Sequence, residues 1–175
     1  HAHEPLHVGA AERVQQRPAG EAERAQAVED RTVDTHEAQR RVGRVAVQRV
    51  AVTREALDAG IAAARPGATI EEISGAVEDV ALRAGYGIVR PYVGHGIGRA
   101  MHEAPQVPNY RTERKSLTLA EGHCLAIEPM FTLGSPEVGV MDDEWTVVTV
   151  DGSLAAHFED SIAIGAGGAE LLTRS

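Results

Sequence analysis

Two histidines and two glutamates are the residues of this chain best suited to chemistry. His95 and His102 lie seven residues apart in a glycine-rich stretch, and Glu128 and Glu159 each lie in an apolar run. Glycine lets the backbone approach a ligand closely, so an imidazole between glycines can meet a metal ion or a substrate. Buried carboxylates are costly unless they are paired or coordinated, so the two glutamates require a cation or a basic partner. Together with His95, the two glutamates form a nitrogen and oxygen ligand set that suits manganese, cobalt, iron or zinc.

Each of these residues also has a structural explanation. A glycine-rich loop with two histidines is compatible with a flexible surface turn, and either glutamate could form a salt bridge with an arginine. The histidine loop alone is weak evidence for a site. Its combination with Glu128 and Glu159 favours metal binding.

Two consecutive helices are predicted ahead of the histidines. Thr53–Arg65 has apolar residues at helical spacing, and Pro66-Gly67 ends it. Thr69 and Glu72 form a capping box at the start of the second helix, and Gly85 suits its C-terminal cap. The apolar face of this helix consists of Ile70, Ile73, Val77 and Val80.

Beyond Gly85, short apolar runs separated by Gly and Pro predict strands and loops. Leu125–Ile127 is a short buried strand. Trp145–Val150 and Ser153–Ile164 are interpreted as the two strands of a hairpin, because the intervening Asp151-Gly152 pair suits a tight turn with positive backbone dihedrals.

Glu159 falls in the returning strand of this predicted hairpin. The alternation of a strand places it on the same side as His157, Ser161 and Ala163, and opposite Phe158, Ile162 and Ile164. One face is therefore apolar, and the other carries a carboxylate.

Residues 1–50 differ in composition from the rest of the chain. They contain eight Arg and eight acidic residues, no aromatic residue and one Leu, so the net charge of −9 comes from residues 51–175. Such a segment cannot build a core, and it predicts a polar, loosely helical or disordered arm. Translation of a GC-rich gene in the wrong frame is the alternative. Because the chain starts with His1 rather than Met, we expect it to be a fragment.

Overall composition narrows the class of protein. The chain has 175 residues and is 43% hydrophobic, which is typical of a soluble globular domain. It has neither a run of about 18 apolar residues nor a secretory signal, and its acidic charge argues against nucleic-acid binding. The single Cys124 agrees with a reducing compartment. We expect a cytoplasmic protein without a membrane or nucleic-acid partner.

Five ordered segments resemble type I methionine aminopeptidase. They are Tyr92–Arg99 (YVGHGIGR), Met101–Tyr110 (MHEAPQVPNY), Ala126–Phe131 (AIEPMF), Glu144–Thr149 (EWTVVT) and Ala155–Ile162 (AAHFEDSI), and the resemblance covers about residues 51–175. It implies an α+β pita-bread fold of the creatinase/aminopeptidase-like kind, a curved antiparallel sheet with flanking helices. Residues 51–175 would form the C-terminal half, the N-terminal half would be incomplete, and residues 1–50 would not be native to the fold.

The resemblance also implies an activity and a set of roles. The family is a hydrolase, a metallo-exopeptidase that uses two divalent ions (Co, Mn, Fe or Zn) to remove the initiator methionine from nascent proteins. By motif match, the metal ligands are His95, Glu128 and Glu159, and Glu128 is also catalytic as a proton carrier. His102 is catalytic and substrate-binding, because it would hydrogen-bond the peptide and stabilise the tetrahedral intermediate. Met101 and Trp145 would line the pocket for the methionine side chain.

The chain departs from the family pattern at two further ligands. The family supplies two Asp from an Asp-x-Gly segment and from a His-Gly-Asp segment eleven residues later, upstream of the first helix. Neither segment occurs: Asp30 and Asp34 do not match, and Asp58-Ala59-Gly60 is followed eleven residues later by Thr69. Three ligands of five remain. We therefore expect incomplete metal occupancy and weak or no activity.

Two other functions stay open. A proline-specific aminopeptidase or prolidase shares the fold, the loop and the ligand types, although Pro108-Asn109-Tyr110 and the Trp145 strand favour methionine aminopeptidase. A non-catalytic relative that binds a protein or ribosomal partner would explain the missing aspartates. For the enzyme, the expected partners are N-termini of nascent polypeptides, at the ribosome or free of it, and we expect a monomer.

Overall fold

The computed structural model describes residues 50–113 and 116–174, which belong to one compact unit, Val42–Ser175. The polar arm predicted for residues 1–50 and its wrong-frame alternative lie, except for residue 50, outside the described residues. The first predicted helix is present, with residues 50–63 helical and a turn at Pro66-Gly67. None of the helices in this part of the chain has the length and apolar character needed to cross a membrane.

The second helix, α3 (Ile70–Ala84), has the predicted caps at both ends. The Thr69 hydroxyl accepts a hydrogen bond from the Glu72 N–H, and the Glu72 carboxylate accepts one from the Thr69 N–H at 2.8 Å. The Thr69 N–H, as the strongest cause, holds the pKa of Glu72 below its usual range. Gly85 caps the C-terminus with φ of 69°. Both predictions are confirmed.

Ten strands follow α3 in the described residues: β1 (Gly87–Ile88), β2 (Gly94–Gly96), β3 (Glu103–Val107), β4 (Cys124–Ile127), β5 (Met130–Thr132), β6 (Val138–Val140), β7 (Val147–Thr149), β8 (Ala155–His157), β9 (Asp160–Gly165) and β10 (Gly168–Leu171). They pair antiparallel in three sheets, with the orders β10-β9-β4-β2-β3, β1-β5-β8 and β6-β7. The predicted strand at Leu125–Ile127 is β4.

One antiparallel register links these three sheets. Cys124 lies opposite Ala163 in the β4–β9 pair, Met130 opposite His157 in β5–β8, and Val138 opposite Thr149 in β6–β7. Each residue further along the first arm, which contains β4, β5 and β6, therefore pairs with one residue earlier in the second arm, which contains β7, β8 and β9. Residues 124–163 form one long hairpin with interruptions, and the chain reverses at Asp143 and Glu144.

The prediction that Asp151-Gly152 joins a hairpin between Trp145–Val150 and Ser153–Ile164 is wrong. Strand β7 pairs with β6, β8 pairs with β5, and β9 pairs with β4 and β10. Asp151-Gly152 does form a turn, with φ of 69° at Gly152, but this turn lies within the second arm.

The true reversal is closed by Asp143, which the sequence pattern did not single out. Its carboxylate accepts hydrogen bonds from the N–H groups of Trp145 and Thr146, and Glu144 has a positive φ of 57°. The Thr146 hydroxyl, as the strongest cause, lowers the pKa of Asp143. The hairpin thus turns on a polar side chain that bonds its own backbone, rather than on glycine.

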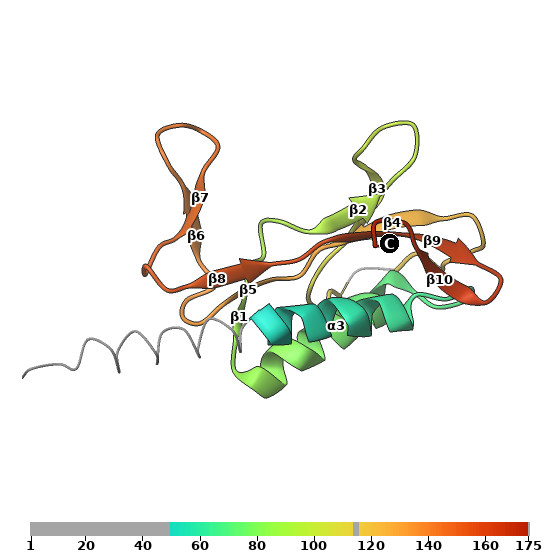
Figure 1. The fold of residues 1–175 in the computed structure, drawn as a ribbon, viewed down its shortest axis with the longest axis horizontal. Helices are drawn as coiled ribbons and strands as arrows, with labels where there is room; N and C mark the ends of the chain where they lie inside the picture. Colours follow the sequence, from blue (N-terminus) through green and yellow to red (C-terminus); the bar gives the residue numbers. More distant parts are fainter. Residues whose placement is uncertain (1–49, 114–115, 175) are drawn as a thin grey trace, which may run out of the picture. The chain divides into compact units, whose positions relative to one another are not determined.

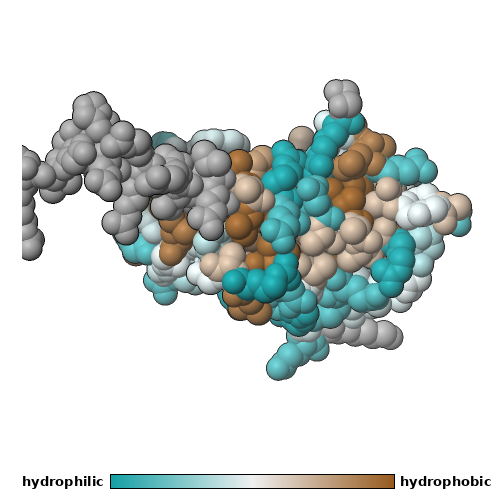
Figure 2. Space-filling view, turned by 60° about the horizontal axis from the view of Figure 1, so that its bottom comes forward, coloured by the Kyte–Doolittle hydropathy of each residue, from teal (hydrophilic) through white to brown (hydrophobic). Residues whose placement is uncertain are grey.

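The core lies between the helices and the sheets. Its largest buried side chains come from both helices and from β4, β5 and β9, and they include Leu57, Ile73, Leu125, Phe131 and Ile162. Figure 1 shows the helices on one side of the long hairpin, with the β6–β7 tip and the β2–β3 loop projecting from the other side. Figure 2 turns the helical side toward the viewer and shows hydrophilic ridges with apolar patches between them.

Candidate metal centre

Glu128 and Glu159 lie opposite each other in the long hairpin. Strand β4 ends at Ile127 opposite Asp160, β5 begins at Met130 opposite His157, and the register between them places Glu128 across from Glu159. The ladder is interrupted here because Pro129 has no N–H to donate, while its carbonyl accepts from the Phe158 N–H at 3.3 Å. Like charges opposite each other destabilise a sheet, so this pair calls for a cation.

The two glutamates differ in burial. The Glu128 side chain is 13% exposed, as its apolar surroundings predicted. The prediction that Glu159 is buried is wrong, because this residue lies exposed between β8 and β9. Ile162 and Ile164 do face the core, but so does Asp160.

Asp160 is the buried carboxylate of this arm, and sequence reasoning missed it. It is 3% exposed, and it accepts hydrogen bonds from Thr173 and from the Arg174 guanidinium at 2.6 Å. Arg54 lies 3.6 Å away. The arginine salt bridge expected for a buried carboxylate is therefore formed by Asp160, whereas the ion-pair partners of Glu128 within residues 50–113 and 116–174 are His95 and His157.

His95 lies in the middle of β2, between β3 and β4. Its Nδ1 is 3.0 Å from the Gly96 carbonyl, which can only accept a hydrogen bond, so in the neutral imidazole this contact favours the tautomer that leaves the Nε2 lone pair available to a ligand. Nε2 is 3.8 Å from Oε1 of Glu128. The β2–β3 register shifts between His95 and Gly96, and such irregularities re-aim side chains beside functional sites.

The glycines around His95 allow close approach of neighbouring strands, because the nearest atoms to an added Cβ are backbone carbonyl oxygens. A Cβ added to Gly94 would lie 2.3 Å from the Ala126 carbonyl oxygen, and one added to Gly96 would lie 2.2 Å from that of Ala104. The glycines therefore let β2 fit between its neighbouring strands.

His102 lies beside His95. The ring centroids are 4.1 Å apart, and His102 is exposed in the loop between β2 and β3. Both residues line an open cavity of about 410 Å³. His95 therefore has His102 on one side and the Glu128 carboxylate on another.

His157 and Asn109 also approach Glu128, and neither was singled out as a site residue. His157 Nε2 is 3.5 Å from Oε2 of Glu128, and ligand atoms of Glu128, His157 and Glu159 all lie within 4.8 Å of one another. The alternation that placed His157 on the face of Glu159 was the available signal. Asn109, which is 1% exposed, donates to the Glu128 backbone carbonyl at 3.0 Å.

These separations fit ligands of a divalent ion. Ligand atoms bound at about 2.1 Å to one ion lie roughly 3.0–3.6 Å from their neighbours, whereas good hydrogen bonds are about 2.7–3.2 Å long. The nitrogens of His157 and His95, at 3.5 and 3.8 Å from the Glu128 carboxylate, are closer to the first geometry. Imidazole and carboxylate are ordinary ligands of zinc, cobalt, iron and manganese.

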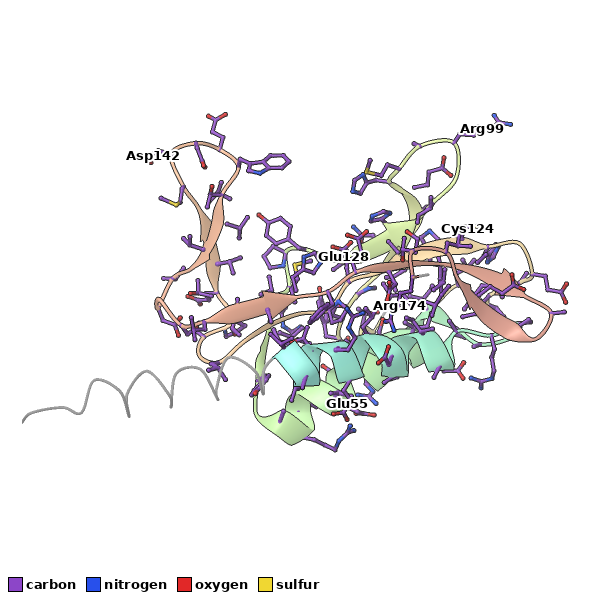
Figure 3. All side chains as sticks on the ribbon, in the orientation of Figure 1. Glu55, Arg99, Cys124, Glu128, Asp142 and Arg174 are labelled. Carbon is purple, nitrogen blue, oxygen red and sulfur yellow. The ribbon has the colours of Figure 1, made fainter. Side chains whose placement is uncertain are left out.

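An apolar cavity of about 430 Å³ adjoins Glu128 and His157. Its walls come from β5, β8 and the β6–β7 hairpin, together with Val89 and Tyr92. Met101 and Trp145 are not among its lining residues, and they are 74% and 87% exposed. Figure 3 shows Glu128 between the β6–β7 tip, which carries Asp142, and the β2–β3 loop, which carries Arg99.

Comparison with known proteins places this site in context. The family model described as "Metallopeptidase family M24" matches residues 30–166. Methionine aminopeptidase of Clostridium acetobutylicum is 45% identical over 73% of this chain and 51% of its own length, and methionine aminopeptidase 1 of Bacillus subtilis is 46% identical over 70% and 50%. The chain therefore spans about half the length of the curated relatives it matches.

Solved structures of two kinds of enzyme match this chain to different degrees. The methionine aminopeptidase of Thermotoga maritima matches with a TM-score of 0.70 and 45% identity, over 73% of this chain and 51% of that one. The prolidase of Pyrococcus furiosus matches with a TM-score of 0.55 and 25% identity, over 73% of this chain and 32% of that one. Both the sequence identity and the TM-score are therefore higher for this methionine aminopeptidase than for this prolidase.

Proposed function

Because this chain belongs to metallopeptidase family M24 and is homologous to its methionine aminopeptidases, we propose that residues 51–175 supply part of a metal-dependent site for removing an N-terminal methionine from polypeptides. The fold is accordingly the α+β pita-bread fold of that family. The observation that carries the proposal is the pair of facing glutamates, Glu128 and Glu159, with Nε2 of His95 beside one of them.

His95, Glu128 and Glu159 would hold the divalent metal. A bound ion of this kind polarises the scissile carbonyl and lowers the pKa of a water molecule. The Gly96 carbonyl fixes the His95 tautomer, and Asn109 holds the Glu128 backbone, so both ligands are oriented in advance.

Glu128 and His102 would serve the peptide itself. The mostly buried Glu128 carboxylate can accept a proton from the attacking water and pass it to the leaving amine. His102, exposed beside His95, can donate a hydrogen bond to the substrate carbonyl as negative charge develops there.

The apolar cavity beside Glu128 supports an apolar side chain in the substrate. Its volume of about 430 Å³ exceeds that of any single side chain, so it can take one apolar residue together with the adjacent backbone. The side chains of Met101 and Trp145 are exposed and would cover a bound methionine side chain. The substrates would be N-termini of newly made chains in the cytoplasm, acted on by a monomer.

Low activity is part of the proposal, because the sequence has no match to the two aspartate ligands of the family. A peptide assay tests it: a Met-Ala-Ser peptide and an Ala-Pro peptide are incubated with the chain and with cobalt, manganese, iron or zinc. We expect slow, chelator-sensitive release of methionine only, absent in Glu128→Gln. Preferential cleavage of the Ala-Pro peptide would instead identify a proline-specific enzyme.

Metal analysis separates the remaining outcomes. Two tightly held ions together with rapid methionine release would contradict the prediction of an incomplete site. Metal binding without hydrolysis of either peptide would favour a non-catalytic relative.

A further inference from the structure

We infer that His157 is itself a metal ligand in this chain, and that Glu128, His157 and Glu159 form a site for a single divalent cation. The inference rests on the metal-binding part of the proposed function. It goes further because the ligand set implied by resemblance contains His95 and does not contain His157.

Strand pairing brings the three side chains together. His157 ends β8 opposite Met130, and Glu159 follows two residues later on the same side of an extended chain. The shared register places Glu128 across from Glu159. Three ligands are therefore set by one pair of neighbouring segments, without any contribution from a distant loop.

The distances suit metal ligation by His157. Its Nε2 lies 3.5 Å from Oε2 of Glu128, which is long for a hydrogen bond and suitable for two ligands of one ion. Ligand atoms of all three residues lie within 4.8 Å of one another, and His95 is not a member of that group. His95 approaches the other oxygen, Oε1, at 3.8 Å.

Charge and access point the same way. Two facing carboxylates carry a charge of −2, which a divalent ion neutralises. The side chain of His157 is 47% exposed, so an ion can reach it from solvent, while Glu128 is 13% exposed and anchors the site. Imidazole with carboxylate favours zinc or cobalt over calcium or magnesium.

The test is cobalt binding to the full chain, measured by isothermal titration and by the visible absorption of bound Co²⁺. His157→Gln removes the imidazole and keeps a polar side chain. We expect this variant to bind Co²⁺ at least about 10–100-fold more weakly, because even residues that only hydrogen-bond a metal ligand contribute that much to affinity. The absorption bands of bound Co²⁺ should change as well. His123→Gln is the matched control: His123 precedes β4, its Nδ1 accepts from the Ala120 N–H, and it is outside the cluster.

Unaltered Co²⁺ affinity and absorption in His157→Gln would overturn the inference. If His95→Gln abolishes binding in the same series, the ligand set of the proposed function stands without His157. If the unsubstituted chain binds no Co²⁺, the inference and the metal-binding part of the proposed function both fail. Metal binding that depends on His157 without any peptide hydrolysis would support the inference and count against the function.

Folding can be controlled independently. Far-UV circular dichroism checks each variant. In the unsubstituted chain, Zn²⁺ should shift the imidazole ¹⁵N resonances of His157 in an NMR titration, and their failure to move on saturation would overturn the inference without any substitution.

Discussion

Replacing Gly94 with alanine should both destabilise the protein and disturb its metal ligands. The added Cβ would lie 2.3 Å from the Ala126 carbonyl oxygen and 3.1 Å from Cβ of Val107, so it would be trapped between β4 and β3. Ordinary van der Waals contact begins at 3.4 Å, so β2 would have to move by about 1 Å. Both obstacles lie on neighbouring strands, and neither is the flexible end of a side chain.

Overpacking of this kind costs about 1–3 kcal/mol in the free energy of unfolding. Because His95 is the next residue, the same movement changes the separation of its Nε2 from Glu128, which is now 3.8 Å. We therefore expect weaker Co²⁺ binding as well as lower stability. Urea unfolding followed by far-UV circular dichroism measures the first effect, since the single Trp145 is 87% exposed and a poor fluorescence probe of the core.

Gly139→Ala is the matched control. Gly139 also lies in a strand, β6, but its added Cβ meets nothing within 4 Å. The control should be neutral or more stable by up to about 1 kcal/mol, because glycine loses more backbone entropy than alanine on folding. Equal unfolding midpoints for the two variants would refute the claim that β2 is packed without spare room.

Three further outcomes are expected. Asp160→Ala should lower the free energy of unfolding by about 1–3 kcal/mol, because Arg174 loses its hydrogen bond to a buried carboxylate while its ion pair with Asp58 remains. The exposed neighbour Glu159→Ala should change it by less than about 0.5 kcal/mol in metal-free urea unfolding. The pKa of Glu72 is lower in the folded than in the unfolded chain, so the ionised carboxylate stabilises the fold above the unfolded pKa of about 4.3, and this stabilisation is lost as the pH falls through the folded pKa. Glu72→Gln should therefore make the free energy of unfolding depend less on pH between about pH 6 and pH 3. Zn²⁺ at about 100 times its dissociation constant should stabilise the chain by about 2.7 kcal/mol, and a chelator should restore the original melting temperature; a melting temperature that does not respond to Zn²⁺ would contradict metal binding by the folded state.

The helices were predictable because their signals are local. Thr69, Glu72 and Gly85 act within one turn of α3, and each occupies the predicted cap. The apolar spacing that marks the core face depends only on the helical period. Such features do not require knowledge of what the helix packs against.

Strand pairing was harder to predict because it depends on distant residues. Asp151-Gly152 is a good hairpin pair by type, yet the chain reverses earlier, at Asp143 and Glu144, where side-chain hydrogen bonds close the turn. The strand after the predicted turn therefore has other partners. Strand alternation places Asp160 on the buried side with Ile162 and Ile164, but the partner that makes this burial possible, Arg174, lies beyond the strand and was hidden.

The candidate site was predictable in its main members and not in its surroundings. The glycine-rich segment and the apolar run identified His95, His102 and Glu128, which the structure places side by side. His157 and Asn109 reach Glu128 only through strand pairing and loop folding. A single sequence contains no signal for contacts of that kind beyond the strand alternation.

The shared register of the long hairpin sets where this protein can tolerate changes in length. The Leu133 N–H donates a hydrogen bond to the Leu154 carbonyl, and Met130 lies opposite His157. These pairs lie between the facing glutamates and the tip of the hairpin, and they align the two glutamates independently of the tip. Residues inserted beyond Leu133 and before Leu154 would enlarge the tip and leave that alignment intact. One residue inserted between Glu128 and Thr132 would turn every following side chain of that arm to the opposite face, so natural insertions and deletions should be confined to the tip.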